Sequence, residues 1–400
     1  MNRIRGGRQG AVVLAVAIGI TIGVAGSAQA ENCAGQRIQT TDGCVGPARV
    51  TSTLKRIVSQ NRQDTKLQAV IARVDIRGRN LLRSGFGQSQ VDVPARPNMN
   101  FRIGSMTIPL LTTLVYKLRQ QGLLKLSDPV SNWLPNLPGA AQVTVRNLMN
   151  NTSGYYDWIQ NNPPFQDQVL ADPFRVWTGG ELLDAALARG SACDPGTCFS
   201  YAHTNFLILS RVVRSVVPGT TLVAQLQRQV LRPLGIRLTF SRLAPIPAPT
   251  LSSFSDGRGF FEETTGWSPS WGLGNGMLAT GSIDNVGRLA RGILSGRSLG
   301  PWARGDIVRQ YAPGIGPNPD RVYFAQGLIM ANGWRRQNPF FNGYMGNVAW
   351  FPARGIGISL VGTSGPETTA PDGVNVTDAI LSDIAAYLTP GNSPALPGAG

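Results

Sequence analysis

"FRIGSMTIPLLTTL", at residues 101–114, is the stretch from which the fold can be read. The helix predicted over residues 105–122 carries on one face Leu110, Leu111, Leu114 and Leu118. Ser105 stands at the start of that helix, where free backbone N–H groups and the helix dipole favour negative charge. A serine in this place is either a helix cap or a nucleophile.

The base that a nucleophilic serine needs is missing one helical turn later. In a Ser-x-x-Lys helix, residues i and i+3 share a face, so a neutral lysine can take the serine proton before the serine attacks a carbonyl. Position 108 holds Ile, which cannot accept a proton. Ile108 also surrounds Ser105 with apolar surface, which disfavours an alkoxide. The loss of a positioned general base costs about 10²–10⁴-fold in rate.

Five further segments follow the serine helix in an order that one family shares. They are GLLKLSDPVSNWLPNLPG (122–139), VTVRNLMNNTSGYYDW (143–158), DPGTCFSYAHTNFLILSRVV (194–213), GNGMLATGSIDNVGRLAR (274–291) and NGYMGNVAWFPARGIGISLVGTS (342–364). Together the six segments resemble the serine β-lactamase and penicillin-binding-protein superfamily, in its class C β-lactamase, D-alanyl-D-alanine carboxypeptidase and esterase branch. The resemblance covers roughly residues 50–385 and implies acyl-enzyme chemistry without a cofactor.

The departures from the family pattern fall on the catalytic motifs. Ser105 is kept, but Ile108 occupies the lysine position. In the second motif Tyr201 is kept, and His203 stands where the family has asparagine. Asn151 stands where the family usually has histidine.

The third motif departs as well. Tyr344 and Met345 stand where the family has Lys or His followed by Thr, while Gly346 remains. These three residues are the expected substrate-binding strand. The resemblance implies that the backbone N–H groups of Ser105 and Asn347 form the oxyanion hole.

The sequence allows two possible roles for each of two side chains in these motifs. His203 either relays a proton from Ser105, directly or through Tyr201, or makes only a local hydrogen bond. Tyr344 either lines the cleft as a hydrogen-bond donor or fills the space of the missing Lys or His.

The sequence is compatible with three functions. The first is a weakly hydrolytic or non-hydrolytic family member that binds a peptidoglycan-like peptide or a related acyl ligand. The second is an active serine hydrolase (esterase, D-Ala-D-Ala peptidase or β-lactamase) that uses Ser105 with Tyr201 or His203 as proton acceptor. The third is an envelope scaffold protein.

The N-terminus predicts export. Three arginines, an apolar run of about 16 residues and a small-x-small ending form a signal peptide over residues 1–30, the alternative being an uncleaved membrane anchor. Outside the cytoplasm, four cysteines indicate disulfides, and the expected local pairing is Cys33–Cys44 and Cys193–Cys198. The sequence leaves the oligomeric state unknown.

Composition narrows the chemistry and the partners. The single histidine, His203, excludes a histidine-rich metal site, and the cysteine spacings do not favour zinc. Without the three signal-peptide arginines the formal charge falls from +15 to +12. The arginines are scattered, so we expect no nucleic-acid partner, with peripheral contact to anionic envelope surfaces as the alternative to a solvated basic surface.

The order of patterns predicts an α/β fold of the α+β kind, an antiparallel sheet flanked by helices with an inserted all-helical domain. After an N-terminal segment at 31–48, the main domain spans 49–388. Its α/β part comprises 49–104 and 265–388, and its helical part comprises 105–264. Residues 389–400 are expected to form a disordered tail.

Overall fold

The computed structural model describes residues 33–274, 277–315, 321–368, 375–392 and 394. The predicted signal peptide lies outside these ranges. Within them, none of the helices has both the length and the hydrophobicity that a bilayer span requires.

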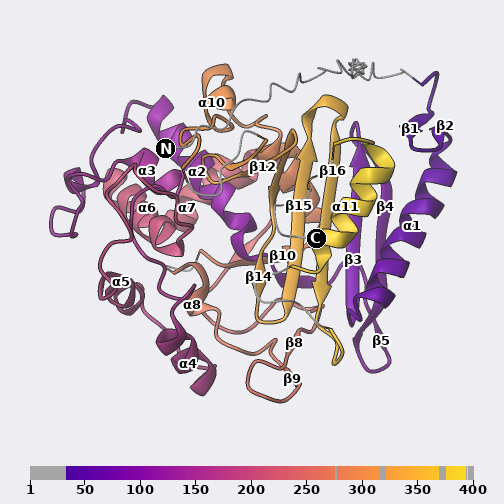
Figure 1. The fold of residues 1–400 in the computed structure, drawn as a ribbon, viewed down its shortest axis with the longest axis horizontal. Coiled ribbons are helices and arrows are strands. Elements are labelled where there is room, and N and C mark those ends of the chain that lie inside the picture. Colours follow the sequence, from indigo (N-terminus) through magenta and orange to yellow (C-terminus); the bar gives the residue numbers. More distant parts are fainter. Residues whose placement is uncertain (1–32, 275–276, 316–320, 369–374, 393, 395–400) are drawn as a thin grey trace, which may run out of the picture.

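One large antiparallel sheet organises the molecule (Figure 1). Its strand order is β11 (Val322–Phe324), β12 (Ile329–Ala331), β13 (Trp334–Gln337), β15 (Tyr344–Phe351), β16 (Ile356–Thr363), β3 (Ala69–Ile76), β4 (Arg79–Gln90) and β5 (Val93–Pro94). The short β14 (Phe340–Phe341) also pairs with β15. Pairing between β3 and β16 joins strands from the N-terminal and C-terminal parts of the chain in one sheet.

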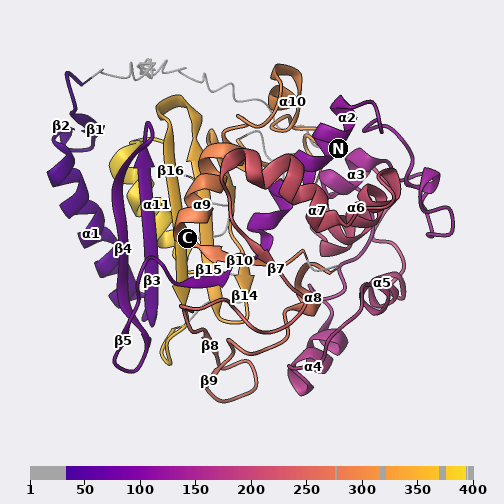
Figure 2. The same cartoon turned by 180° about the vertical axis from the view of Figure 1, so that it is seen from behind.

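The two faces of the sheet pack against different helices, because successive strand residues point to opposite sides. Val70, Ala72 and Val74 of β3 share a core with α1 (Pro47–Asp64) and α11 (Thr377–Leu388). Ala69 and Ile71 belong to the core on the opposite face, which includes α2 (Ile108–Gln120) and α9 (Ile283–Leu289). Figure 2 shows α9 in front of the sheet on that face.

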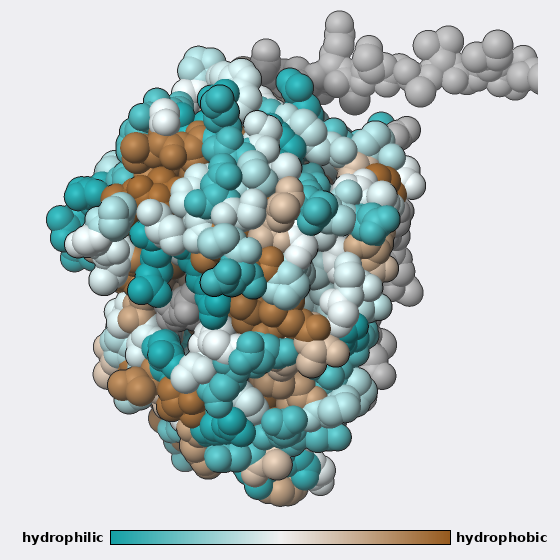
Figure 3. Space-filling view, turned by 90° about the vertical axis from the view of Figure 1, so that its left-hand side faces the viewer, coloured by the Kyte–Doolittle hydropathy of each residue, from teal (hydrophilic) through white to brown (hydrophobic). Residues whose placement is uncertain are grey.

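The helical part lies between β6 (Asn100–Arg102) and β10 (Ala279–Ser282), which pair with each other. Its helices are α3 (Val145–Met149), α4 (Pro163–Ala171), α5 (Gly179–Leu187), α6 (His203–Val216), α7 (Leu222–Leu226) and α8 (Ser270–Leu273). Short strands follow these helices: β7 (Thr239–Phe240) pairs with β10, and β8 (Phe254–Ser255) pairs with β9 (Glu262–Glu263). Beyond β10, α10 (Pro301–Asp306) covers the top of the helical side (Figure 1). Figure 3 shows that hydrophilic residues cover much of this end, with separate hydrophobic patches between them.

Both ends of the described chain pack on the body. At the N-terminus, β1 (Ile38–Thr40) and β2 (Gly43–Val45) form a hairpin. At the C-terminus, the prediction of a disordered tail is wrong for residues 389–392 and 394. Trp334 donates its indole N–H to the carbonyl of Asn392 (2.8 Å), and the buried Arg336 donates to the carbonyl of Pro394 (2.6 Å). A buried arginine needs such acceptors, which explains why this part of the tail is held. The rest of the predicted tail lies outside the described residues.

Candidate active site

Ser105 lies in a 3₁₀ turn, Gly104–Thr107, that leads directly into α2. The helix predicted from this stretch is therefore confirmed, with its first turn more tightly wound. Gly104 has a φ of 52°, and a methyl group added to it would come within 2.5 Å of the Pro339 Cβ. The turn that presents Ser105 thus depends on glycine, and it brings the serine close to the chain at Pro339.

Tyr201 is the side chain in hydrogen-bond contact with Ser105. Its hydroxyl donates to the Ser105 Oγ at 3.3 Å. Asn151, at the position of the family's histidine, holds the tyrosine segment: its carbonyl accepts from Ser200 N–H (2.9 Å) and its Oδ1 accepts from Ala202 N–H (3.2 Å). Burial raises the pKa of Tyr201, the Ser105 hydrogen bond lowers it, and Asp157 raises it, with a net increase. Tyr201 is therefore a neutral phenol at physiological pH and a poor proton acceptor.

His203 is the first residue of α6, and its ring is oriented by a carboxylate that the sequence motifs did not single out. Its Nδ1 lies 2.8 Å from the Oδ2 of Asp157, and its backbone N–H donates to the same oxygen. The backbone N–H groups of Ile159 and Gln160 donate to the other oxygen (2.7 and 2.9 Å). The ring of His203 meets the Tyr201 ring edge to face, with centroids 5.3 Å apart.

Asp157 is 3% exposed, and its charge is compensated locally. Burial alone would raise the pKa of Asp157, but His203 and the N–H donors outweigh it and hold that pKa below its usual range. A carboxylate held in this way favours the tautomer of His203 that carries its proton on Nδ1, which leaves Nε2 as the acceptor. Geometry thus pairs His203 with Asp157, and Tyr201 is the side chain bonded to Ser105 Oγ among the described contacts.

Ile108 lies three residues after Ser105, and its surroundings are apolar. It is 1% exposed and belongs to the core that contains Leu111, Leu148 and Met149. Gly327, between β11 and β12, lies against it: a methyl group on Gly327 would come within 3.2 Å of Ile108 Cγ2. Nothing at this position can take a proton from Ser105.

The prediction that Tyr344, Met345 and Asn347 form the substrate strand and the oxyanion hole is wrong. Tyr344 is 2% exposed and donates its hydroxyl to the carbonyl of Leu251 (2.5 Å), and burial raises its pKa to about 12. Met345 packs in the core on the α11 face. Asn347 is fully buried in the middle of the sheet, where it pairs with Leu360 of β16.

Backbone directions exclude the Asn347 N–H as an oxyanion donor. Gly346 N–H donates to the carbonyl of Pro339 (2.9 Å), on the β14 side of β15. Because N–H groups alternate along a strand, the next one, from Asn347, points toward β16. Gly346 itself faces Met106: a methyl group there would come within 2.8 Å of Met106 Cε.

The chain that borders Ser105 is the segment before this strand, Gln337–Phe340. Asn342 and Gly343 both have positive φ (44° and 81°) and form a two-residue hairpin turn between β14 and β15. In such a hairpin the flanking pair, Phe341 with Tyr344, exchanges hydrogen bonds, and the next pair, Phe340 with Met345, does not. The N–H of Phe340 therefore points away from β15, one residue beyond the Pro339 that contacts the Ser105 turn.

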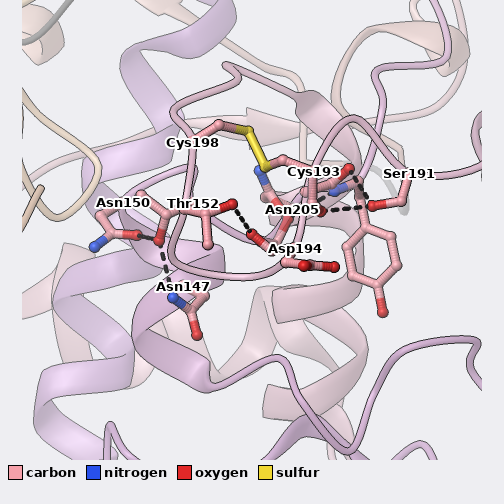
Figure 4. The surroundings of a disulfide bond; sticks show 12 residues. Asn147, Asn150, Thr152, Ser191, Cys193, Asp194, Cys198 and Asn205 are labelled. Atoms are coloured by element: carbon pink, nitrogen blue, oxygen red, sulfur yellow. Dashed lines mark hydrogen bonds between the residues drawn. A yellow bond between two sulfur atoms is a disulfide. The ribbon is translucent and has the colours of Figure 1, made fainter. Parts of the chain in front are cut away.

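Both predicted disulfides are present, Cys33–Cys44 and Cys193–Cys198. The second lies in the loop that leads to Tyr201 (Figure 4). This loop is bound to the segment before Asp157, since Gly196 N–H donates to Thr152 O (2.7 Å) and Ala192 N–H to Gly154 O (2.8 Å). Disulfide and hydrogen bonds together fix the approach of Tyr201 to Ser105. Among the described residues, no cluster of His, Cys, Asp and Glu could hold a metal ion.

Comparisons with known proteins agree with this architecture. A family model described as Beta-lactamase matches residues 54–380. The putative penicillin-binding protein PbpX of Bacillus subtilis (strain 168) is 26% identical over 161 residues, 40% of this chain and 38% of that protein. Esterase EstB of Burkholderia gladioli is 27% identical over 206 residues, 48% of this chain and 51% of the esterase. The aligned part of the chain thus spans between about two fifths and half of these relatives.

Solved structures share the fold over most of the chain. A D-stereospecific amidohydrolase from Streptomyces sp. superposes with a TM-score of 0.70 at 21% identity, covering 86% of this chain and 99% of that chain. An octameric penicillin-binding protein homologue from Pyrococcus abyssi gives a TM-score of 0.71 at 19% identity, covering 87% and 79%. Because the family model spans most of the sequence and the fold agrees, this chain belongs to the beta-lactamase family of serine hydrolases.

Proposed function

We propose that this protein binds an acyl ligand, such as a peptidoglycan-like peptide or a related amide or ester, at Ser105 and turns it over slowly or not at all. The observation that carries the proposal is the buried Ile108 in the place of the base. Tyr201, the group bonded to Ser105, has a raised pKa and cannot substitute for a base near neutral pH.

Two backbone N–H groups beside Ser105 support ligand binding. The N–H of Ser105 at the start of its helical turn and the outward N–H of Phe340 are the two donors that we assign to a carbonyl oxygen. Neither donor depends on a side chain, so neither was affected by the changes at positions 108 and 203. We further propose export to an oxidising compartment, which the two disulfides support.

A second function is favoured by one observation, the Asp157–His203 pair. A histidine held by a buried carboxylate is the arrangement that activates nucleophiles in many hydrolases. If Nε2 reaches the Ser105 proton through one water or through Tyr201, the protein is an active, rewired hydrolase.

Intact mass measurement tests the proposal. Purified protein is incubated with a fluorescent penicillin and, separately, with a fluorophosphonate, alongside Ser105→Ala. We expect no adduct or an adduct that forms over hours, and none in Ser105→Ala. Complete labelling within minutes at neutral pH, together with catalytic ester hydrolysis, would refute impaired turnover and favour the second function.

A further inference from the structure

Although the arginines are scattered along the sequence as a whole, one group of basic residues lies together at one end of the molecule. Residues 33–66 and the β3–β4 turn at 77–79 hold eight lysines and arginines against two aspartates. Their net charge of +6 is half of the +12 that remains without Arg3, Arg5 and Arg8. The eight are Arg37, Arg49, Lys55, Arg56, Arg62, Lys66, Arg77 and Arg79, and we call the surface that they form the basic end.

The elements that carry these residues lie together. Figure 1 shows β1, β2, α1 and β4 at one end of the sheet, opposite the helical part. Arg79 donates to the side chain of Gln36 (2.8 Å), and Arg77 N–H donates to Gly355 O (2.8 Å). Through Gly355 the basic end continues to Arg354, which donates to Gln39 O (2.8 Å).

Most of this charge is not compensated by carboxylates. Three described carboxylates lie at this end: Asp42 pairs with Arg49 at 3.4 Å, Asp64 accepts a hydrogen bond from Gln60, and Asp383 of α11 accepts one from Asn61 of α1 (2.8 Å). In the described part of the chain, the ion pairs of the molecule include none with Lys55, Arg56, Arg77 or Arg79, all of which are exposed. Burial lowers the pKa of Arg354, and repulsion from the neighbouring Arg77 lowers it further. Like charges held this close favour an anionic partner.

The course of the chain indicates which anionic partner this is. The apolar run AVVLAVAIGITIGVAG ends at residue 26, and the described structure begins at residue 33, beside β1. Seven residues span at most roughly 25 Å, so a bilayer that holds the apolar run lies close to the basic end. We propose that the apolar run is retained as the uncleaved membrane anchor, the alternative to a signal peptide, and that the basic end docks on the anionic headgroups of the bilayer that holds it, which orients the Ser105 site relative to that surface.

Vesicle co-sedimentation of the full chain tests the proposal. Vesicles of phosphatidylcholine alone are compared with vesicles that contain about one third phosphatidylglycerol, because the apolar run contributes equally to both. The test variant is Lys55→Gln/Arg56→Gln/Arg79→Gln, and the charge-conserving variant is Lys55→Arg/Arg56→Lys/Arg79→Lys. The matched control, Arg214→Gln/Arg228→Gln/Arg232→Gln, removes the same charge from exposed positions of the helical part.

We expect tighter binding to the anionic vesicles, with an excess that falls as salt rises, because a basic residue near such a surface contributes about fivefold in affinity. The test variant should lose at least about tenfold of that excess, while the charge-conserving variant and the control stay within about twofold of the wild type. Equal binding to the two kinds of vesicle, or equal losses in the test variant and the control, would overturn the proposal. Preference for a soluble anionic polymer over the anionic vesicles at equal charge concentration would overturn it too.

Discussion

Two regions flank Ser105, and they differ in chemical character. On one side, Tyr201, His203 and Asp157 form a polar network in which the buried carboxylate has four hydrogen-bond donors. On the other side, Ile108 and Gly327 are packed in an apolar core. Ser105 is thus bordered by a hydrogen-bonded network on one side and by packed apolar side chains on the other. This difference predicts that variants on the two sides affect the positioning of the serine and its proton transfer separately.

The largest effect is expected from restoring an amine on the apolar side. Ile108→Lys should speed phosphonylation of Ser105 by a fluorophosphonate, in which the serine oxygen displaces fluoride from phosphorus, at least about 10²-fold, because a buried lysine has a lowered pKa and can act as a general base. Ile108→Met, of similar length and neutral, is the matched control and should leave the rate unchanged. Equal rates in the two variants would show that the rest of the site no longer supports the reaction.

The polar side can be disrupted at Asp157. Asp157→Asn turns an acceptor oxygen into a donor that faces N–H groups, and should lower the free energy of unfolding by about 3 kcal/mol. Asp172→Asn is the control, because Asp172 also accepts backbone N–H groups but is exposed, and it should cost less than about 1 kcal/mol. Denaturant unfolding at pH 7 measures both.

The loss of stability caused by Asp157→Asn should depend on pH. Since the folded pKa of Asp157 lies below its ordinary value, its ionisation stabilises the protein above about pH 4, and this contribution is lost as pH falls through the folded pKa. The stability gap between wild type and Asp157→Asn should therefore narrow below about pH 4. A gap that stays constant down to pH 2 would contradict the assignment.

The smallest expected effect is at the contact between Tyr201 and Ser105. Tyr201→Phe removes one long hydrogen bond to Ser105 and should slow fluorophosphonate labelling of Ser105 about tenfold or less. Tyr155→Phe removes another buried phenol hydroxyl, one that donates to Pro138 O, and should leave this labelling unchanged. A similar loss in both variants would mean that Tyr201 acts only through packing.

Much of this picture could be predicted from the sequence, because the motifs that place Ser105 and Tyr201 are local. The helix after Ser105 follows from its apolar periodicity, and both disulfides follow from the local pairing of the four cysteines. Asp157 was missed because a single aspartate in a loop carries no signal until the fold places it under α6.

The third motif shows why local similarity can misplace a strand. The sequence around Gly346 suggested a substrate strand, but the Asn342–Gly343 pair was the stronger signal, since such a pair between apolar residues marks a two-residue hairpin turn. The chain beside Ser105 is therefore the segment before the turn, with Gln337 at the end of β13 and Pro339 just before β14. Strand order, which the sequence alone does not reveal, decides which strand borders the site.

The pH dependence of Ser105 phosphonylation in the wild-type protein tests the central claim most directly. The rate of fluorophosphonate labelling is followed by intact mass between pH 6 and 9.5, a range in which Tyr201 stays protonated. If no resident base serves Ser105, hydroxide must remove its proton, and the rate should rise about tenfold per pH unit without a plateau. A rate that reaches a plateau near neutral pH in the wild type, but not in His203→Asn, would contradict the claim that Ser105 has no resident base. It would show that the Asp157–His203 pair is the general base.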